Sequence, residues 1–90
     1  MNFEWDQNKG DSNLSKHGVS FDEATTVFDD PLYLDFFDPD HSYDEYRYII
    51  IGQSSNNRLL FVSYTEYGEN IRLISAREAT RRERKDYEEG

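Results

Sequence analysis

The chain has 90 residues, a formal net charge of −9 and no cysteine. This length suits one small domain, so residues 1–90 are expected to form a single folded unit. The lack of cysteine excludes disulfides and thiolate metal sites, and no segment approaches the roughly 18 apolar residues of a membrane span. No apolar run follows a basic stretch at the N-terminus, so we expect a soluble, cytoplasmic protein without a secretion signal.

The charge is divided unevenly along the chain. Residues 1–57 contain twelve acidic and three basic residues, whereas residues 58–90 contain seven of each. A dominant basic surface is therefore absent, and any contact with nucleic acid must be local. An enzyme tolerates such a local contact better than a high-affinity binder does.

The chain begins with a short predicted strand over residues 2–5, followed by a polar helix between Asp6 and Gly18. Asp6 is a favourable N-cap, and Gly18 is a favourable stop just past the helix end. Leu14 is the one clear apolar residue, so this helix is expected to lie on the surface. At 100° per residue, three polar residues share one stripe of this helix: Lys9, Asn13 and Lys16.

A second helix is predicted to begin at Ser20. Ser20 and Glu23 have the spacing of a capping box, and the helix ends before Pro31 because the residue before proline avoids helical geometry. Apolar residues recur at helical spacing and should face the core: Phe21, Ala24, Val27 and Phe28.

Four further strands are predicted, joined by short connections and one acidic loop over residues 38–45. The predicted strands cover residues 32–37, 46–54, 59–65 and 71–76. Short turns join antiparallel neighbours. The order of elements therefore predicts an α+β fold, a small antiparallel sheet with two or three helices packed on one face.

A charged C-terminal helix follows the last predicted strand and reaches Tyr87. Thr80 and Glu83 form a capping box at its start. Ser75 and Glu78 form a competing box, so the start of the helix is uncertain by about one turn.

Four motifs occur in order from residue 2 to about residue 88, and together they are specific. They are Phe3-Glu4-Trp5-Asp6, Asn13-Leu14-x-Lys16-His17-Gly18-Val19-x-Phe21, Val27-Phe28-x-Asp30-Pro31 and Ile74-Ser75-Ala76-Arg77-x-Ala79-Thr80-x-x-Glu83-Arg84. With these motifs the chain resembles the BrnT family of toxins from bacterial type II toxin–antitoxin systems. Tyr67 departs from this pattern, because many members carry arginine at this position.

The resemblance implies a fold similar to the RelE-type ribonuclease toxins and an endoribonuclease activity that arrests translation. It implies RNA as substrate and a BrnA-type antitoxin as partner, with DNA contacted only through the antitoxin. No cofactor and no metal are expected. The acidic first half of the chain favours an alternative, a catalytically weak or inactive toxin-like module that acts by binding the antitoxin.

Metal-free RNA cleavage requires a group that takes the 2′ proton, a group that protonates the leaving oxygen, and fixed cations beside the phosphate. Arginine suits the last role because its planar fork matches phosphate and stays charged. The chemistry and the resemblance together favour Arg72 and Arg77 as the clamp on the scissile phosphate. Strand alternation predicts that Arg72 faces solvent or a groove, and Arg77 is expected to follow the last strand.

Further candidates have weaker support. Glu66 or His17 could move a proton, and Lys16 could contact the phosphate. Three residues are expected to bind RNA: Lys9, Arg81 and Arg82.

These residues also have purely structural interpretations. A three-residue hairpin loop would pair Glu66 with Arg72 as a salt bridge, whereas a two-residue loop would pair Thr65 with Arg72. Lys16 and His17 could instead interact with the C-terminal dipole of the first helix. His41 lies in the acidic loop, where a metal site is not expected.

Overall fold

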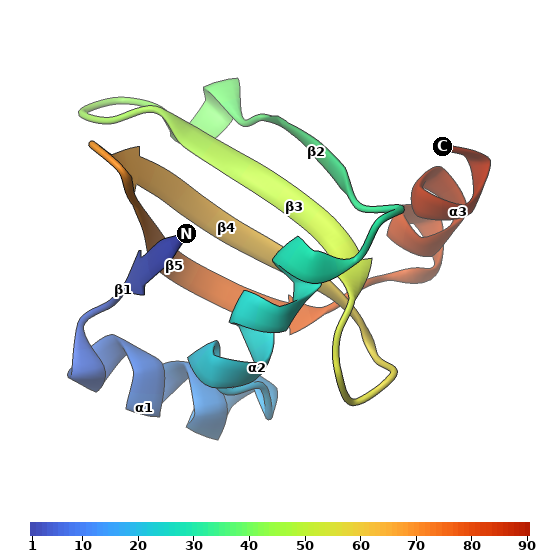
Figure 1. Cartoon of the computed structure of the whole chain (residues 1–90), viewed down its shortest axis with the longest axis horizontal. Helices are drawn as coiled ribbons and strands as arrows, with labels where there is room; N and C mark the ends of the chain where they lie inside the picture. The colour runs from blue at the N-terminus through green and yellow to red at the C-terminus, as the bar shows by residue number, and fades with distance from the viewer.

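A computed structural model of the protein describes residues 1–90 and forms one five-stranded sheet with helices on both of its faces (Figure 1). The elements in chain order are β1 (Asn2–Glu4), α1 (Gln7–His17), α2 (Phe21–Thr25), the 3₁₀ turn η1 (Thr26–Asp29), β2 (Leu34–Phe37), the 3₁₀ turn η2 (Pro39–His41), β3 (Arg47–Gln53), β4 (Leu59–Tyr67), β5 (Asn70–Glu78) and α3 (Arg81–Glu89). None of the helices has the length and apolar character needed to cross a bilayer.

The sheet is mixed, so the prediction of a purely antiparallel sheet is wrong in one place. The strand order is β1-β5-β4-β3-β2, and β1 pairs with β5 in parallel. Short turns join β3 to β4 and β4 to β5, the acidic loop joins β2 to β3, and all three pairs are antiparallel. The chain between β1 and the other strands contains α1 and α2, which is long enough for a parallel arrangement. The class α+β is confirmed.

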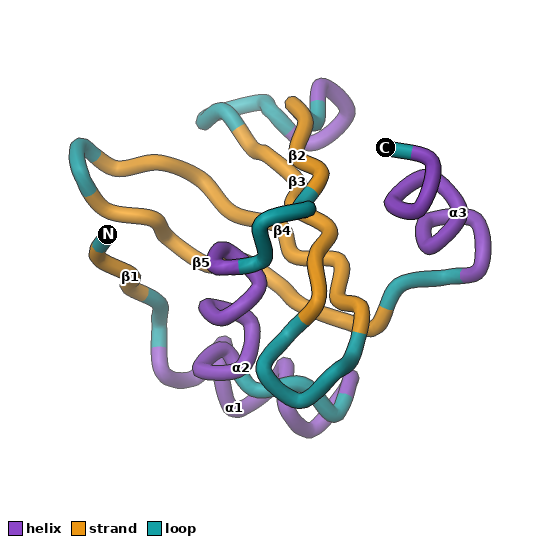
Figure 2. The backbone as a smooth tube through the Cα atoms, turned by 45° about the vertical axis from the view of Figure 1, so that its right-hand side comes forward, coloured by secondary structure: helices purple, strands orange, loops and turns teal.

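The prediction that the helices share one face is also wrong. α1 and α2 cover one face, whereas α3 lies on the other (Figures 1 and 2). β3 carries the run Ile49-Ile50-Ile51, and alternate residues of a strand point to opposite faces. Ile50 joins the main core, while Ile49 and Ile51 form a second cluster against which Tyr87 of α3 packs. An apolar strand on both faces requires cover on both.

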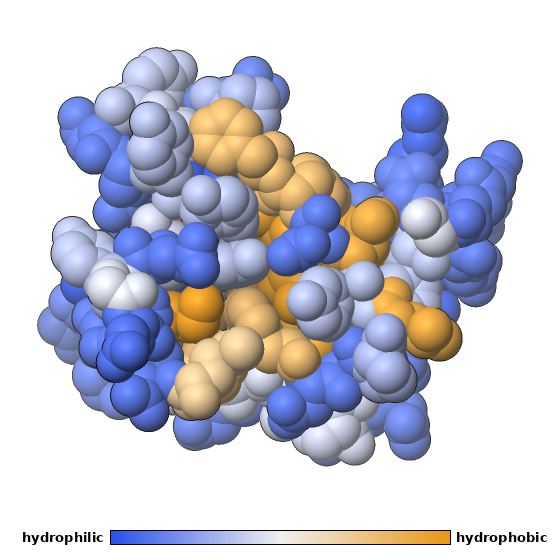
Figure 3. Space-filling model, turned by 45° about the horizontal axis from the view of Figure 1, so that its top comes forward, coloured by the Kyte–Doolittle hydropathy of each residue, from blue (hydrophilic) through white to orange (hydrophobic).

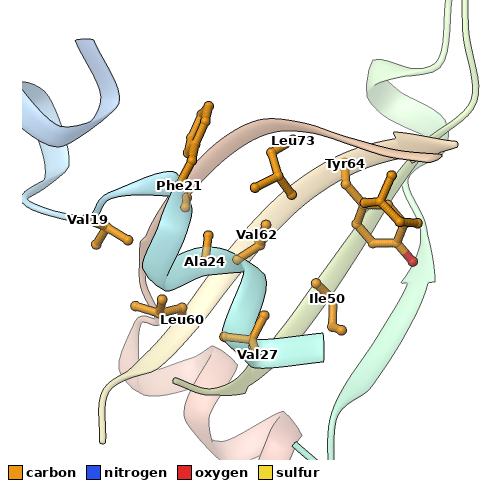
Figure 4. Packing of buried hydrophobic residues seen from close by; sticks show 11 residues of the cluster. Val19, Phe21, Ala24, Val27, Ile50, Leu60, Val62, Tyr64 and Leu73 are labelled. Carbon is orange, nitrogen blue, oxygen red and sulfur yellow. The ribbon is translucent and has the colours of Figure 1, made fainter. Parts of the chain in front are cut away.

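The main core lies between the sheet and α2 (Figure 4). Phe21, Ala24 and Val27 are buried there, as their helical spacing predicts, and Phe28 is partly buried beside them. They pack against alternate residues of the central strands: Ile50, Leu60, Val62, Tyr64 and Leu73. The helix is shorter than predicted, because its last residues tighten into η1.

Asn13 holds α1 against the edge of β5. Its amide nitrogen donates to the carbonyls of Ala76 (2.8 Å) and Val19 (2.9 Å), and its amide oxygen accepts from the N–H of Ala76 (3.0 Å). β1 pairs only with Asn70–Arg72, so the edge of β5 beyond Arg72 has no strand neighbour. The amide of Asn13 therefore supplies the donor and acceptor that a neighbouring strand would supply.

The ends of α1 follow the sequence prediction. Asp6 accepts hydrogen bonds from the N–H groups of Asn8 and Lys9, and Gly18 ends the helix with a φ of 70°. Glycine adopts this left-handed geometry without steric cost. Leu14 is 51% exposed, and α1 turns Gly10 and Asn13 inward instead.

Glu23 fulfils only half of the predicted capping box. Ser20 accepts a hydrogen bond from the backbone of Glu23 (3.0 Å), but the Glu23 carboxylate is buried against Arg58 and Ser54. Hydrogen bonds from Arg58 outweigh the effect of burial and hold the pKa of Glu23 below its usual value. This ion pair ties α2 to the β3–β4 turn.

We expect Asn13→Ala to lower the free energy of unfolding by about 3 kcal/mol, because it leaves buried groups of Ala76 and Val19 without partners. Chemical denaturation measures this loss. The matched control is Asn8→Ala, an exposed change on the same helix that should stay within about 0.5 kcal/mol of the parent. Equal stability of the two variants would contradict the role given to Asn13.

Candidate functional site

A β-bulge places the two predicted arginines on the same face of β5. Arg77 pairs with Phe61 and Arg72 pairs with Thr65, and the register shifts at Ile74 between them. Phe61 and Thr65 lie four residues apart in β4, so their side chains point to the same face of the sheet, the one that α3 partly covers. Directly paired residues share a face, so Arg77 and Arg72 point to that face as well. In a regular strand, residues five apart point to opposite faces of the sheet. The bulge adds one unpaired residue to β5, so that Arg72 and Arg77 point to the same face.

Arg77 lies within β5 rather than after it, and a carboxylate already holds it. Its two terminal nitrogens donate to the two carboxylate oxygens of Glu83 at 2.8 and 2.9 Å, and its guanidinium lies 4.1 Å from the ring centre of Phe61. The hydrogen bonds with Glu83 raise the pKa of Arg77. Burial raises the pKa of Glu83, but the bonds from Arg77 and from the Thr80 backbone outweigh it, so the net pKa is lowered.

Arg72 points toward the opposite end of the strand. A guanidinium nitrogen lies 3.6 Å from a carboxylate oxygen of Glu4 in β1, and the group lies 5.8 Å from the ring centre of Tyr67. The hairpin turn has two residues, so Thr65 faces Arg72, as one of the two predicted registers requires. Glu66 pairs with Ile71 instead, is exposed and does not contact Arg72.

The expectation that Arg72 and Arg77 clamp one phosphate is therefore not met in this structure. Their partners in β4 are four residues apart, a separation of about 13 Å along a strand. Each guanidinium also leans away from the other, toward Glu4 or toward Glu83. One anion could contact both only if these side chains changed rotamer.

A groove with a volume of about 810 Å³ lies on this face between the sheet and α3. Ser63 and Ser75 form part of its floor, and Phe36 and Phe61 add aromatic rings. Its cationic residues are Arg47, Arg77 and Arg82. Its carboxylates are Asp38, Asp40, Glu83 and Asp86. The groove thus offers positive, apolar and hydroxyl groups together, but carboxylates that line the same groove balance the charge of its cations.

The structure adds two groove residues that the sequence prediction missed. Arg47 of β3 lies across from Thr65, and its Nε is buried without a hydrogen-bond partner. The Nδ1–H of His41 donates to a carboxylate oxygen of Asp38 (2.9 Å), which leaves its Nε2 free. Alternation from Ile49 predicts the orientation of Arg47, whereas nothing in the sequence positions His41.

A second, smaller concavity of about 190 Å³ lies between α1 and β5. Lys9, Asn13 and Lys16 line it, as their shared helical stripe predicts, and His17 borders it as well, together with Ile74 and Ser75 at the bulge. Ile74 and Ser75 also line the larger groove. The two concavities therefore meet at the bulge and form one continuous surface from α1 to α3.

The remaining candidates fall outside this surface. Arg81 is exposed and lines neither concavity, and Glu66 borders a separate hollow with Tyr46 and Tyr48. No three His, Asp or Glu side chains come together in a way that could hold a metal ion. The structure thus groups Arg77, Arg82, Lys9, Lys16 and His17, but it leaves Arg72, Arg81 and Glu66 apart from them.

Comparisons with known proteins support one family. A family model described as a ribonuclease toxin, BrnT, of type II toxin–antitoxin systems matches residues 5–83. The crystal structure of the Brucella abortus ribonuclease toxin BrnT is similar, with 24% sequence identity, a TM-score of 0.66, and coverage of 90% of this chain and 99% of that chain. This likeness shows a shared fold. No curated protein sequence matches the chain.

We expect Arg77→Met to raise the pKa of Glu83, because the carboxylate stays partly buried and loses its cation. Carboxyl NMR titration of the parent and the variant measures this shift. The pair stabilises the fold by about 1 kcal/mol after solvent screening, fully above the usual Glu pKa of 4.5. The stability difference between parent and variant should therefore vanish as the pH falls through the lowered pKa of Glu83. An unchanged pKa of Glu83 would contradict the assigned contact.

Proposed function

Because the chain belongs to the BrnT family of ribonuclease toxins of type II toxin–antitoxin systems, we propose that it is an endoribonuclease that cleaves RNA without a metal ion and thereby inhibits translation. The observation that best supports this is the continuous surface that carries Lys9, Lys16 and His17 at one end and Arg77 and Arg82 at the other. Its partner would be a BrnA-type antitoxin, and it would meet DNA only through that antitoxin.

The RNA backbone would cross the sheet edge at the bulge. Lys9 would bind a phosphate on the α1 side and Arg82 one on the α3 side, whereas Lys16 and Arg77 would approach the scissile phosphate at the bulge between them. Phe36, which is exposed at the groove, offers a ring face on which an unpaired base can stack, whereas the ring of Phe61 is covered by Arg77. Because base stacking and phosphate contacts are tolerant of sequence, such a site would take single-stranded RNA of varied sequence.

Cleavage would proceed through attack of the ribose 2′-hydroxyl on the adjacent phosphate, with its proton passing to a base. The bond from phosphorus to the 5′ oxygen of the next nucleotide breaks, that oxygen takes up a proton, and a 2′,3′-cyclic phosphate remains. The phosphorane gains negative charge, which Arg77, Lys16 and a reoriented Arg72 would stabilise more than they stabilise the ground state. His17 is the better supported proton carrier, because it borders the same concavity as Lys16, whereas Glu66 lies outside it. His41 is a further candidate, since Asp38 orients its ring.

An incoming phosphate would have to compete with Glu83 for Arg77. A bidentate carboxylate and a phosphate use the same fork of the guanidinium, so the two ligands exclude each other. The Glu83–Arg77 pair therefore favours a second candidate function. The acidic composition of the chain supports the same alternative. In this alternative, the chain is a catalytically weak or inactive toxin-like module that works by binding its antitoxin.

We expect Arg77→Ala and Arg72→Ala to lower the rate of RNA cleavage by about 100-fold or more, the usual cost of losing a group that stabilises transition-state charge. Lys16→Ala should cost less, because lysine supplies a point charge without a fork. The matched control is Arg84→Ala, an exposed arginine of α3 outside the groove, which should stay within about threefold of the parent.

Incubation of purified protein with total RNA, with and without EDTA, measures these rates. Full cleavage by both the Arg72 and Arg77 variants would show that the proposed residues are wrong. Intact RNA at high excess of the parent protein would favour the binding module instead.

A further inference from the structure

β2 is the outermost strand of the sheet and has an open edge. The strand order ends at β2, which pairs only with β3. The N–H of Asp38 donates to the carbonyl of Arg47 (2.8 Å), which continues the β2–β3 ladder by one residue. In an antiparallel pair the bonded residues alternate, so Phe36 also bonds inward, and the backbone groups of Asp35 and Phe37 point to the open edge.

Aromatic side chains flank this open edge on both faces of the sheet. Phe36 lies across from Ile49 on the groove face, and Phe37 lies across from Tyr48 on the opposite face. Each of the two phenylalanines is 44% exposed. The side of the molecule that carries β2 shows hydrophobic residues at the surface between hydrophilic ones (Figure 3). An exposed edge strand with apolar side chains is a template for an added strand.

The segment around this edge is strongly acidic. Residues 29–45 contain no lysine or arginine and seven carboxylates: Asp29, Asp30, Asp35, Asp38, Asp40, Asp44 and Glu45. This charge repels the phosphates of RNA and DNA, and it repels the same edge of a second copy of the chain. The charge therefore selects an occupant that is basic, and the exposed aromatic rings select one that is also apolar.

We propose that the edge of β2 is the docking site for a basic, extended segment of the antitoxin, which adds a sixth strand to the sheet. This inference rests on the proposed function for the existence of that partner. The added strand would pair with the outward backbone groups of Asp35 and Phe37 and would place its cations beside the flanking carboxylates.

The position of this edge also explains how the partner would block the toxin. Phe36, Asp38 and His41 line the large groove, so a strand docked on β2 lies at the mouth of the groove. The partner would then exclude RNA by occupying the rim, without contacting Arg77 at the far side. Neutralisation and phosphate binding would thus use different surfaces of opposite charge.

Asp35→Pro tests the pairing directly. Proline removes only the outward N–H at this position, because the pairing with β3 uses Leu34 and Phe36, and edge strands tolerate proline when its nitrogen faces solvent. The matched control is Asp35→Ala, which removes the same side chain and keeps the N–H. Calorimetry with the antitoxin encoded beside this gene measures the dissociation constant. It should be about tenfold or more higher for Asp35→Pro than for Asp35→Ala.

A second set of variants tests whether the carboxylates around β2 contribute to binding. Neutralising Asp35, Asp40 and Asp44 with asparagine should weaken antitoxin binding and flatten its dependence on salt. The control neutralises three exposed carboxylates elsewhere, Asp11, Glu69 and Glu88, and should leave the affinity within about threefold of the parent. Equal effects of the two triple variants would show that net charge, rather than this edge, determines binding.

Hydrogen exchange on the unmodified complex makes the test independent of how well the proline variant folds. The amides of Asp35 and Phe37 should become protected when the antitoxin binds. No protection there, with protection elsewhere, would overturn the proposal, as would equal affinity of the proline and alanine variants, absence of antitoxin binding by the parent, or a dimer of the chain through β2.

RNA cleavage by the same variants separates this inference from the proposed enzyme. Asp35→Pro should cleave RNA like the parent and resist the antitoxin. If the parent protein cleaves no RNA, and Asp35→Pro weakens antitoxin binding, the docking site is supported and the ribonuclease activity is refuted.

Discussion

The three hydrogen bonds of Asn13 are the link on which the arrangement of this molecule depends. On the side away from β4, β5 has a strand neighbour only along its first three residues, and the rest of that edge would otherwise expose unpaired backbone groups. The side-chain amide of Asn13 bonds to both the carbonyl and the N–H of Ala76. It also donates to the carbonyl of Val19, which follows the end of α1. The polar helix α1, which has almost no apolar face, is thereby fixed to the sheet, and its lysines come to border the bulge.

The bulge at Ile74 is the second constraint, because it decides what the functional face contains. Without the extra residue, either Arg72 or Arg77 would point into the main core. With it, both arginines, Thr65, Ser63 and Ser75 share a face that α3 covers only in part. Bulges often occur next to binding sites for this reason. On this face the carboxylate of Glu83 occupies the fork of the Arg77 guanidinium.

Much of the fold could be predicted from local rules. The cap at Asp6, the left-handed Gly18 and the capping box of Thr80 and Glu83 all depend on neighbours within four residues, and all are confirmed. The parallel pairing of β1 and the position of α3 on the second face could not be predicted, because they depend on contacts between distant segments. The carboxylate of Glu23 shows the same limit, since it pairs with Arg58, which lies 35 residues away in the chain.

The candidate site was only partly predictable for the same reason. Helical periodicity grouped Lys9 with Lys16, and the structure keeps them together. The strand arginines were identified by type and position, but a convergent clamp requires knowledge of side-chain partners such as Glu4 and Glu83. Arg47 was overlooked because a single basic residue at the start of an apolar strand gives no signal until the sheet register is known.

The placement of α3 has a consequence for synthesis of the protein. α3 leaves the ribosome after all five strands, yet it supplies one wall of the groove, and Tyr87 near its end donates a hydrogen bond of 2.6 Å to Asp30, fifty-seven positions earlier in the chain. A nascent chain therefore has a sheet but an unfinished groove until α3 folds back. The outer edge of β2 needs only β3 beside it and precedes α3 in the chain, so this edge and the finished groove become available at different stages of synthesis.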